Sequence, residues 1–374
     1  METGQGSRDR DVESAIVIDG VFFQLNNTGI ARVWNEILTR WQDAEFARRI
    51  VLLDRKNSLP KFPKLRTIPC AAFSYENWRE DRAMVQKICD LAGARLFVST
   101  YYTRPERTSS VVLVHDMIPE RFGFNLQAPA WQQKHDAIRY ATAFAAVSRN
   151  TLADLRCFFP ETVAKPAIIT SPGVSANFVP ATAEEQRLFR AGIIWPYLEG
   201  RPYFLFVCEL SAEKNAAVLL RALQRMSAAI LGGIALLFTH KGEMINDFCS
   251  LPGLKVHATR LTDAGLRAAY GSALALIYPS RYEGFGLPPL EAMACGCPVI
   301  CSNTSSLPEV VGDAALLIDP DDDEQLLTHL LRVQDRAVRE QLRHAGLNRA
   351  KNFSWDAMAS KLETFLTNAS FVPA

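Results

Sequence analysis

The feature that most limits the fold of this chain is a repeated alternation between short β-branched apolar runs and longer amphipathic stretches. Such apolar runs are typical of buried parallel strands, and the stretches between them have the period of helices that cover a sheet. The alternation occurs twice, and residues 172–202, which are rich in proline and glycine, separate the two series. The sequence therefore predicts an α/β protein with two doubly wound, Rossmann-like domains in tandem.

The first series predicts a domain over residues 1–180, followed by a linker at 181–202. Its expected strands are 15–19, 50–53, 96–99, 111–115, 143–147 and 167–170. Its expected helices are 30–41, 81–91, 129–141 and 150–158.

The second series predicts a domain over residues 203–354 and a terminal segment at 355–374. Its expected strands are 203–208, 234–239, 274–278 and 299–301. Its expected helices are 216–228, 262–272 and 289–295. A further helix is expected at 355–366, and we expect it to pack back on the first domain.

Charge and composition exclude several classes of protein. The 374 residues include 41 Lys and Arg against 40 Asp and Glu, so no overall field favours nucleic acid, and none is expected as a partner. Residues 48–66 hold seven basic side chains and one acid, which predicts a solvated face, with contact to an anionic membrane or acceptor as the alternative. The polar leader and the absence of long apolar runs predict a cytoplasmic protein that spans no membrane.

Neither the cysteines nor the acidic run suggests a metal site. The eight cysteines stand mostly singly among apolar residues, which predicts free thiols, and the cluster Cys295, Cys297 and Cys301 matches no common zinc spacing, so we expect it in the core. The acids of 319–324 precede an apolar helical stretch, which favours a helix start over a divalent-cation site.

The stretch 278–299, YPSRYEGFGLPPLEAMACGCPV, carries the most chemistry. Gly284 and Gly286 allow the backbone to approach a ligand closely, and prolines at 288 and 289 start a helix. The N–H groups at such a helix start can bind phosphate. Glu283 and Glu291 can border the same pocket, where carboxylates accept hydrogen bonds from the vicinal hydroxyls of sugars.

These residues also carry a resemblance. EGFGLPPLEAMACGCPVI and the following SNTSSLPEVVGDAALLIDPDD closely resemble the retaining glycosyltransferases of the GT-B family, which includes bacterial mannosyltransferases and glycogen and sucrose synthases. The resemblance covers nearly the whole chain and is strongest over 204–322. It implies two domains facing across a cleft, a donor held by the second domain, an acceptor held by the first, and transfer with retention that needs no metal or other cofactor.

The resemblance also implies roles for residues of the second domain. By the family pattern, Glu283 lies beside the donor sugar, Glu291 binds the ribose, and the amides of Phe285, Gly286 and Leu287 contact sugar and phosphate. Lys214 matches the lysine that neutralises the diphosphate. Two departures stand nearby, because Glu213 replaces the usual arginine and Cys208 replaces a common glycine.

In the first domain the resemblance implies four site residues. Gly29 belongs to the glycine-containing loop after the first strand, where donor phosphate and acceptor approach, and Arg32 follows it as an expected acceptor contact. His115 and Asp116 end the strand VVLVHD and match the family's His-Asp pair beside the donor sugar. Together with Glu283 they are the expected catalytic residues.

The sequence thus predicts a hexosyltransferase acting in surface polysaccharide synthesis. GDP-mannose is the first candidate donor, another nucleotide-diphosphate hexose is the alternative, and the acceptor is a glycan or a lipid-linked oligosaccharide that places the enzyme at the inner face of the membrane. The alternatives are a nucleotide-sugar epimerase, a glycan phosphorylase, or a catalytically silent sugar-binding module, which Glu213 motivates. A dinucleotide-dependent dehydrogenase is disfavoured because no G-x-G-x-x-G follows a predicted strand.

Overall fold

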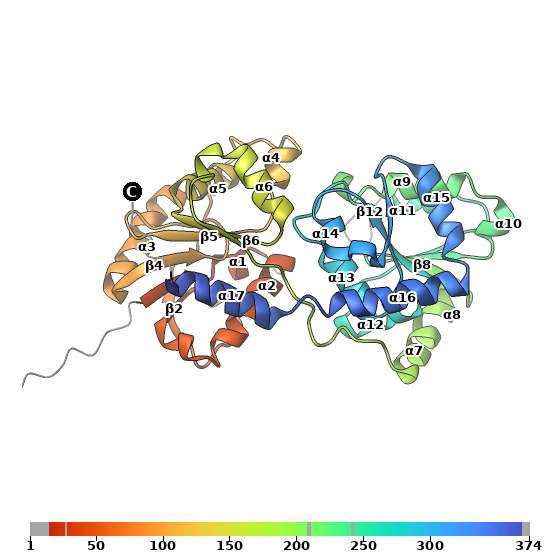
Figure 1. Cartoon of the computed structure of the whole chain (residues 1–374), viewed down its shortest axis with the longest axis horizontal. Coiled ribbons are helices and arrows are strands. Elements are labelled where there is room, and N and C mark those ends of the chain that lie inside the picture. The colour runs from red at the N-terminus through yellow and green to blue at the C-terminus, as the bar shows by residue number, and fades with distance from the viewer. Residues whose placement is uncertain (1–14, 27, 208–210, 241, 243, 369–374) are drawn as a thin grey trace, which may run out of the picture.

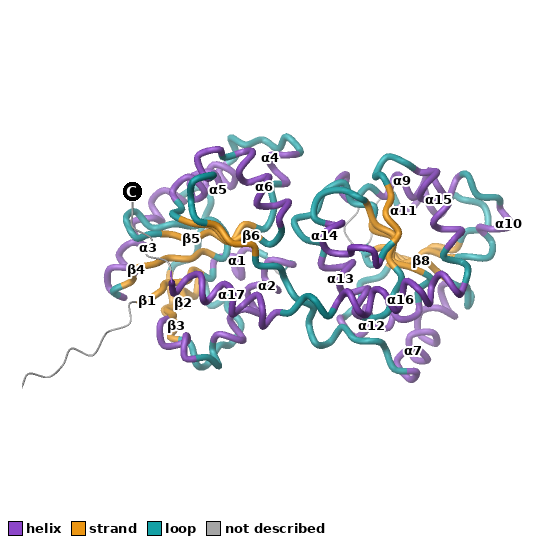
Figure 2. Tube along the Cα trace, in the orientation of Figure 1, coloured by secondary structure: helices purple, strands orange, loops and turns teal. Residues whose placement is uncertain are grey.

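A computed structural model describes residues 15–26, 28–207, 211–240, 242 and 244–368. Each half of the chain forms a parallel sheet that lies between helices (Figures 1 and 2). The expected α/β fold with two doubly wound, Rossmann-like domains is therefore confirmed. The polar leader and Cys208 lie outside the described residues.

The first sheet has the strand order β3-β2-β1-β4-β5-β6-β7. Every neighbouring pair in it is parallel. Its strands are β1 (Ala15–Asp19), β2 (Ile50–Arg55), β3 (Arg66–Cys70), β4 (Ala94–Ser99), β5 (Ser110–Val114), β6 (Ala143–Ala146) and β7 (Ala167–Ile169). The order reverses between β1 and β4, which is where ligands bind in sheets of this kind.

The second sheet has the order β10-β9-β8-β11-β12-β13 and is also parallel throughout. Its strands are β8 (Tyr203–Phe206), β9 (Ala235–Phe238), β10 (Lys255–Ala258), β11 (Ala275–Tyr278), β12 (Val299–Ser302) and β13 (Leu316–Ile318). The central strands β8, β9, β11 and β12 are buried along their whole length, as helices on both faces require.

Helices connect these strands. The first domain has α1 (Val21–Leu25), α2 (Gly29–Trp41), η1 (Glu45–Arg49), α3 (Trp78–Ala92), α4 (Ile118–Arg121), α5 (Pro129–Tyr140), α6 (Arg149–Phe158) and η2 (Pro160–Thr162). Between the two sheets in the sequence lie α7 (Ala183–Phe189), η3 (Arg190–Ile194) and α8 (Trp195–Leu198). The rest are η4 (Ala212–Lys214), α9 (Ala216–Gln224), α10 (Ala228–Leu231), α11 (Ile245–Cys249), α12 (Asp263–Ser272), α13 (Leu287–Ala294), α14 (Leu307–Val311), η5 (Gly312–Ala314), α15 (Asp323–Arg332), α16 (Arg336–Ala350) and α17 (Trp355–Asn368).

Two expectations about side chains are confirmed. Asp322 caps α15 by accepting a hydrogen bond from the amide of Gln325, so the acidic run is a helix start. Cys295, Cys297 and Cys301 are free and buried in the core of the second domain. Within the described part of the chain, no helix combines the length and the apolar character that crossing a bilayer would require.

Two expectations need correction. Residues 181–202 are not irregular linker: Thr182 forms a capping box with Glu185 that starts α7, and α7 and α8 pack on α12 and β10 of the second domain. The solvated face expected at 48–66 needs one exception: most of its basic side chains are exposed, but Arg55 is fully buried and pairs with Asp19 at 2.6 Å and Asp81 at 2.7 Å.

The C-terminal helix α17 lies on the first domain, as Figure 1 shows in dark blue. The indole of Trp41 donates to the carbonyl of Ala359 at 3.1 Å, and Arg40 pairs with Asp356 at 2.5 Å. The chain therefore crosses between the domains twice, once before α7 and once before α17 (Figure 2).

Candidate active site

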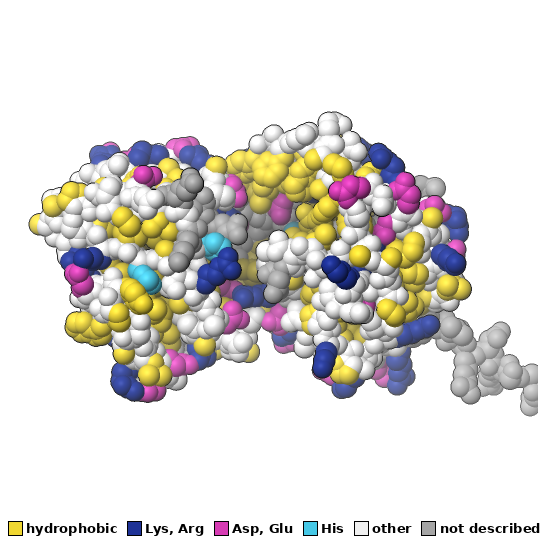
Figure 3. Space-filling view, turned by 180° about the vertical axis from the view of Figure 1, so that it is seen from behind, with side chains coloured by type: hydrophobic (Ala, Val, Ile, Leu, Met, Phe, Trp, Pro, Cys, Tyr) yellow, Lys and Arg dark blue, Asp and Glu magenta, His cyan; other side chains and the backbone are white. Residues whose placement is uncertain are grey.

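The predicted site residues follow strands whose carboxyl ends face each other across a groove between the domains, which Figure 3 shows from behind. His115 and Asp116 follow β5, and the loop 279–286 follows β11. A Cβ atom built on Gly284 would lie only 1.8 Å from the carbonyl oxygen of His115. The two loops therefore touch, and only glycine fits at position 284 in this arrangement.

The loop before α13 is held in shape by two serines that the sequence analysis did not assign. Ser305 Oγ accepts a hydrogen bond from the amide of Glu283 at 3.0 Å. The buried hydroxyl of Ser306 lies 2.9 Å from the carbonyl of Glu283 and 2.7 Å from that of Phe285. Gly286, which caps α13, has a φ of 109°, a conformation that L side chains rarely adopt. The amides that follow therefore have a fixed direction at the helix start.

Glu283, in this loop, forms an ion pair with Lys214. Lys214 Nζ lies 2.7 Å from a carboxylate oxygen of Glu283, and both side chains are largely buried. Asn215, in the left-handed region at φ 57°, donates from its amide nitrogen to the carbonyls of Pro279 at 3.1 Å and Pro320 at 2.6 Å. This clamp ties the segment after β8 to the loop after β11, so the lysine and the carboxylate are positioned by one network.

His115 is buried at the tip of β5, and its Nε2 has no hydrogen-bond partner among the described residues. Burial, aided by the positive charge of Lys134, lowers the pKa of His115 to about 3, so the ring is neutral. A buried polar atom without a protein partner is costly unless a ligand or water satisfies it. The Asp116 carboxylate instead accepts from the amide of Ile118 at 3.0 Å, at the start of α4.

Glu291 lies inside the groove and is almost fully buried. It pairs with Arg32 of the first domain, while the hydroxyl of Tyr270 is 3.5 Å away. Arg32 also reaches Asp263 at 3.1 Å. The structure thus pairs Arg32, which is predicted to contact the acceptor, with Glu291, which is predicted to bind the ribose.

Burial raises the pKa of Glu291 to about 7, even though Arg32 opposes the rise. The positive charge of Arg32 favours the ionised carboxylate, and the nearby charge of Asp263 disfavours it. Glu291 is therefore poised to change its protonation state near neutral pH.

Gly29 begins α2 and faces the start of α13. A Cβ built on Gly29 would lie 3.7 Å from Leu287, which is an ordinary contact. The protein itself therefore does not demand glycine at this position, and the predicted need for close approach concerns a ligand. Phe285, also predicted at this site, is buried and packs edge-on against Phe353 at 5.7 Å.

Further contacts between the domains were missed from the sequence. The carboxylate of Glu309 accepts hydrogen bonds at 3.0 Å from the amides of both Arg149 and Asn150, at the start of α6. The hydroxyl of Tyr282 donates to Asp154 at 2.8 Å, and Thr151 donates to the carbonyl of Gly284 at 3.0 Å. The quoted stretch SLPEVV contains Glu309, but its partner on the other domain could not be known before the domains were placed.

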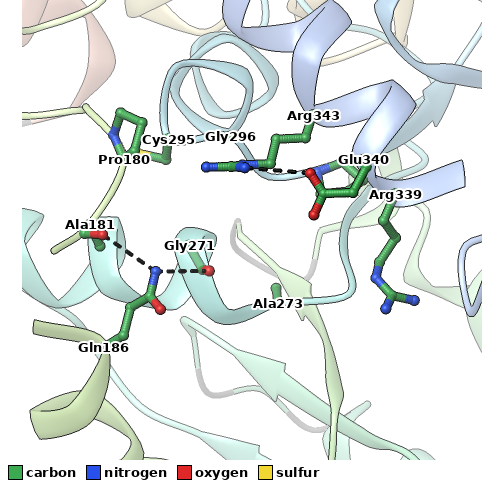
Figure 4. A pocket seen from close by; sticks show the side chains of 11 residues that line it. Pro180, Ala181, Gln186, Gly271, Ala273, Cys295, Gly296, Arg339, Glu340 and Arg343 are labelled. Carbon is green, nitrogen blue, oxygen red and sulfur yellow. Dashed lines mark hydrogen bonds and ion pairs between the residues drawn. The ribbon is translucent and has the colours of Figure 1, made fainter. Parts of the chain in front are cut away.

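A cavity of about 250 Å³ in the second domain lies apart from this groove. Arg339 and Arg343 of α16 face Gln186, Gly271 and Cys295 across it (Figure 4). No predicted site residue lines this cavity. Among the described residues, no group of three or more His, Cys, Asp and Glu side chains is placed to hold a metal ion. That the chemistry needs no metal stays a prediction.

A family of glycosyltransferases and two bacterial enzymes match this chain in sequence. Residues 194–353 match the glycosyl transferases group 1 family. Over 95 residues the chain is 54% identical to O-antigen chain mannosyltransferase B from Escherichia coli, and the match spans 25% of each protein. Over 272 residues it is 24% identical to O-antigen chain mannosyltransferase RfbU from Salmonella typhimurium, and this match spans 69% of each.

A solved structure shares the fold. Sucrose-phosphate synthase from Thermosynechococcus elongatus superimposes with a TM-score of 0.74 at 18% identity, covering 94% of this chain and 98% of that one. At this identity the likeness concerns the fold. The chain has the GT-B fold, and its residues 194–353, less than half of its length, match the glycosyl transferases group 1 family.

Proposed function

We propose that the protein is a metal-independent hexosyltransferase that transfers a sugar, with retention of the anomeric configuration, from a nucleotide sugar to a glycan or lipid-linked acceptor. One observation carries the proposal. In the groove between the domains, the Glu283–Lys214 pair precedes Gly284, whose backbone lies against the carbonyl of His115, a buried, neutral residue whose Nε2 lacks a partner among the described residues. The named relatives support the same reaction class.

Charge separation explains why these groups suit the reaction. Breaking the bond between the anomeric carbon and the diphosphate places positive charge on the sugar and negative charge on the leaving phosphate. In this proposal Lys214 and the amides at the start of α13 stabilise the phosphate, while Glu283 and the carbonyl of His115 contact the sugar; the support is that Lys214 pairs with Glu283 and that Gly284 lies against His115. The neutral His115 ring can hydrogen-bond a sugar hydroxyl without adding charge.

The proposed retention follows from attack on the same face that the phosphate leaves. The acceptor oxygen forms a bond to the anomeric carbon as the bond to the phosphate oxygen breaks. The proton of the acceptor hydroxyl passes to the leaving phosphate, so no protein carboxylate forms a covalent intermediate. Closure of the two domains excludes the water that would otherwise hydrolyse the donor.

The donor we propose is GDP-mannose, and the process is surface polysaccharide synthesis at the inner face of the membrane. The support is the 54% identity to an O-antigen mannosyltransferase over 95 residues, which are a quarter of that relative's length. Glu291 would accept hydrogen bonds from the ribose hydroxyls, and Gly29 would let the diphosphate approach.

Transfer assays with defined sugars test the proposal. The protein is incubated with GDP-mannose, UDP-glucose, ADP-glucose or dTDP-glucose and with mannose oligosaccharides, and products are followed by mass spectrometry. We expect mannose transfer from GDP-mannose, an α-linked product by NMR, and unchanged rates in EDTA. Nucleotide binding without transfer would instead support the silent binding module, and conversion of donor without acceptor would support an epimerase. Release of sugar 1-phosphate from the glycan by inorganic phosphate would support a phosphorylase.

Removing the positive charge of Lys214 tests the role of the lysine directly. We expect Lys214→Met to lower kcat about 10²- to 10³-fold, the range found when one stabilising group is lost from a transition-state site. The matched control is Lys255→Met, because Lys255 pairs with Glu199 on the surface at 2.5 Å, away from the groove. Equal rates in the two variants would contradict the assigned role.

A further inference from the structure

We infer that the connection between α4 and α5, with the groove behind it, binds the sugar chain of the acceptor over several residues beyond the reacting one. This inference rests on the proposed function and extends it to the substrate. Figure 3 shows hydrophobic side chains gathered on the first domain at the edge of the cleft, at the level where Figure 1 places α4. Phe122 and Phe124 of this connection are 37% and 45% exposed.

These exposed rings are continuous with the site. Phe122 packs edge-on against Tyr282, with ring centroids 6.3 Å apart, and Tyr282 directly precedes Glu283. The α4 helix itself begins two residues after Asp116. We therefore expect an acceptor chain that extends from the site along the first domain to pass Phe122.

The rings are also held in place. Phe124 packs edge-on against Trp131 of α5, with centroids 5.9 Å apart, and the amide of Phe124 donates to the carbonyl of Pro119 at 3.0 Å. Aromatic rings fixed by their neighbours lose little conformational entropy when a ligand covers them. One face of a pyranose ring is lined by C–H groups, which makes it an apolar partner for such a surface.

A groove of about 340 Å³ continues the surface beyond these rings. Its walls include Trp78 and Leu126, which are apolar, and Gln127, Gln132 and His135, which are polar. The amide of Gln132 donates to that of Gln127 at 3.3 Å. Planar amides beside apolar surface match the hydroxyl rim and the apolar face of a sugar ring, so the groove suits a second part of the same chain.

Charge favours a neutral glycan over an anionic lipid surface. The basic side chains near the rings face acids: Arg121 lies 3.4 Å from Asp154, and Lys134 lies 2.8 Å from Glu120. Arg139, on the wall of the groove, lies 3.4 Å from Glu161. Arg79, on the same wall, donates to Gln132 at 3.5 Å and lies over the ring of Trp78 instead of facing an acid. With the other cations neutralised locally, the surface offers little excess positive charge to a membrane.

The test measures how transfer depends on acceptor length. Mannose oligosaccharides of one to five residues serve as acceptors for the wild type and for Phe124→Ala and Phe122→Ala. We expect KM for the longer acceptors to rise about tenfold, equivalent to about 1.4 kcal/mol, while KM for the single mannoside and the affinity for GDP-mannose stay unchanged. Phe124→Tyr should keep most of the affinity.

The control is Phe158→Ala, because Phe158 is 37% exposed, like Phe122, but ends α6 at the end remote from Gly284. Thermal unfolding of each variant checks that the fold is kept. If length dependence is unchanged in both test variants, the inference is wrong and the proposed function stands. Binding of each variant to anionic lipid vesicles is measured as well. If loss of this binding is the only defect of the variants, the surface is a membrane contact and the inference is again wrong.

Failure of the proposed function is distinguishable from failure of the inference. Saturation-transfer NMR with unlabelled mannotetraose reports binding to the intact protein whether or not transfer occurs. Signals in the wild type that vanish in Phe124→Ala support the glycan site even if no donor is used. Equal signals in both proteins overturn it.

Discussion

At the scale of single residues, Glu291 is a carboxylate held in an almost fully buried environment. Its carboxylate is buried between α13 and α2, and Arg32 and Tyr270 are its partners. Burial of a carboxylate disfavours the charged form, and one cationic partner compensates only part of that cost. The pKa of Glu291 is accordingly raised to about 7 from an ordinary value of 4.5.

The raised pKa of Glu291 predicts how the stability of the folded protein depends on pH. The folded protein holds a proton on Glu291 up to about pH 7, whereas the unfolded chain releases it near pH 4.5. Because the folded state binds the proton more tightly, the free energy of unfolding falls as pH rises from about 4.5 to about 7. We expect Glu291→Gln to lose this fall, as measured by urea unfolding at pH 5, 6, 7 and 8.

The partner of Glu291 provides the control. Arg32→Met removes the positive charge that lowers the pKa of Glu291, so the fall in stability should extend to higher pH. A pH profile of stability that is the same in the wild type, Glu291→Gln and Arg32→Met would contradict the pKa assigned to Glu291.

The proposed contact between Glu291 and the ribose makes a linked prediction. An ionised carboxylate accepts hydrogen bonds better than a protonated one, so the affinity for the nucleotide sugar should increase as pH rises through 7.

At the scale of elements, the sequence predicts every interior strand of both sheets and the edge strand β7, but not the other three edge strands. The apolar run 15–19 matches β1 at both ends. The strands that were missed are β3, β10 and β13, and all three are edge strands. An edge strand has fewer buried faces, so β3 alternates between exposed and half-buried residues and even contains Pro69, which removes the apolar run that marks a central strand.

The α6 helix has a cap that belongs to the other domain. Ser148 accepts from the amide of Thr151 as the N-cap within the first domain, but the amides of Arg149 and Asn150 donate to Glu309. A carboxylate at a helix start also gains from the helix dipole. Glu309 is thus a helix cap that forms only when the domains are together.

Removing this cap should therefore weaken the closed arrangement. We expect Glu309→Ala to cost about 1 kcal/mol of stability, the usual value of a cap, and to speed hydrogen exchange at the amides of Arg149 and Asn150. The matched control is Asp335→Ala, because Asp335 caps α16 within its own domain by accepting from Ala337 at 2.8 Å. A similar loss of stability without faster exchange in α6 is expected there. Unchanged exchange in Glu309→Ala would show that α6 does not depend on the other domain.

At the scale of the whole molecule, the site is made by two domains that the sequence predicts separately. His115 and Glu283 are expected at the site from their places after strands and from the family resemblance, but nothing in the sequence indicates that Gly284 lies against the backbone of His115. Tyr282 was missed for the same reason, since its hydroxyl finds Asp154 only across the groove. Contacts of this kind depend on the relative placement of the domains, and no local periodicity encodes that placement.

A methyl group at position 284 should separate the domains without unfolding either one. In Gly284→Ala the new Cβ would lie 1.8 Å from the carbonyl oxygen of His115, and neither backbone can yield by that amount. Opening of the domains relieves the clash but breaks contacts such as the Glu309 cap, so we expect the protein to lose at least about 1 kcal/mol of stability while each domain stays folded. We also expect the radius of gyration in X-ray scattering to increase and transfer to fall about 100-fold, since a misplaced reacting group can cost about that factor. Gly265→Ala is the control, because a Cβ there meets its nearest neighbour at an ordinary 3.5 Å. If Gly284→Ala scatters like the wild type and transfers sugar at the same rate, the loops after β5 and β11 do not meet in the working enzyme, and the site must be assembled in another way.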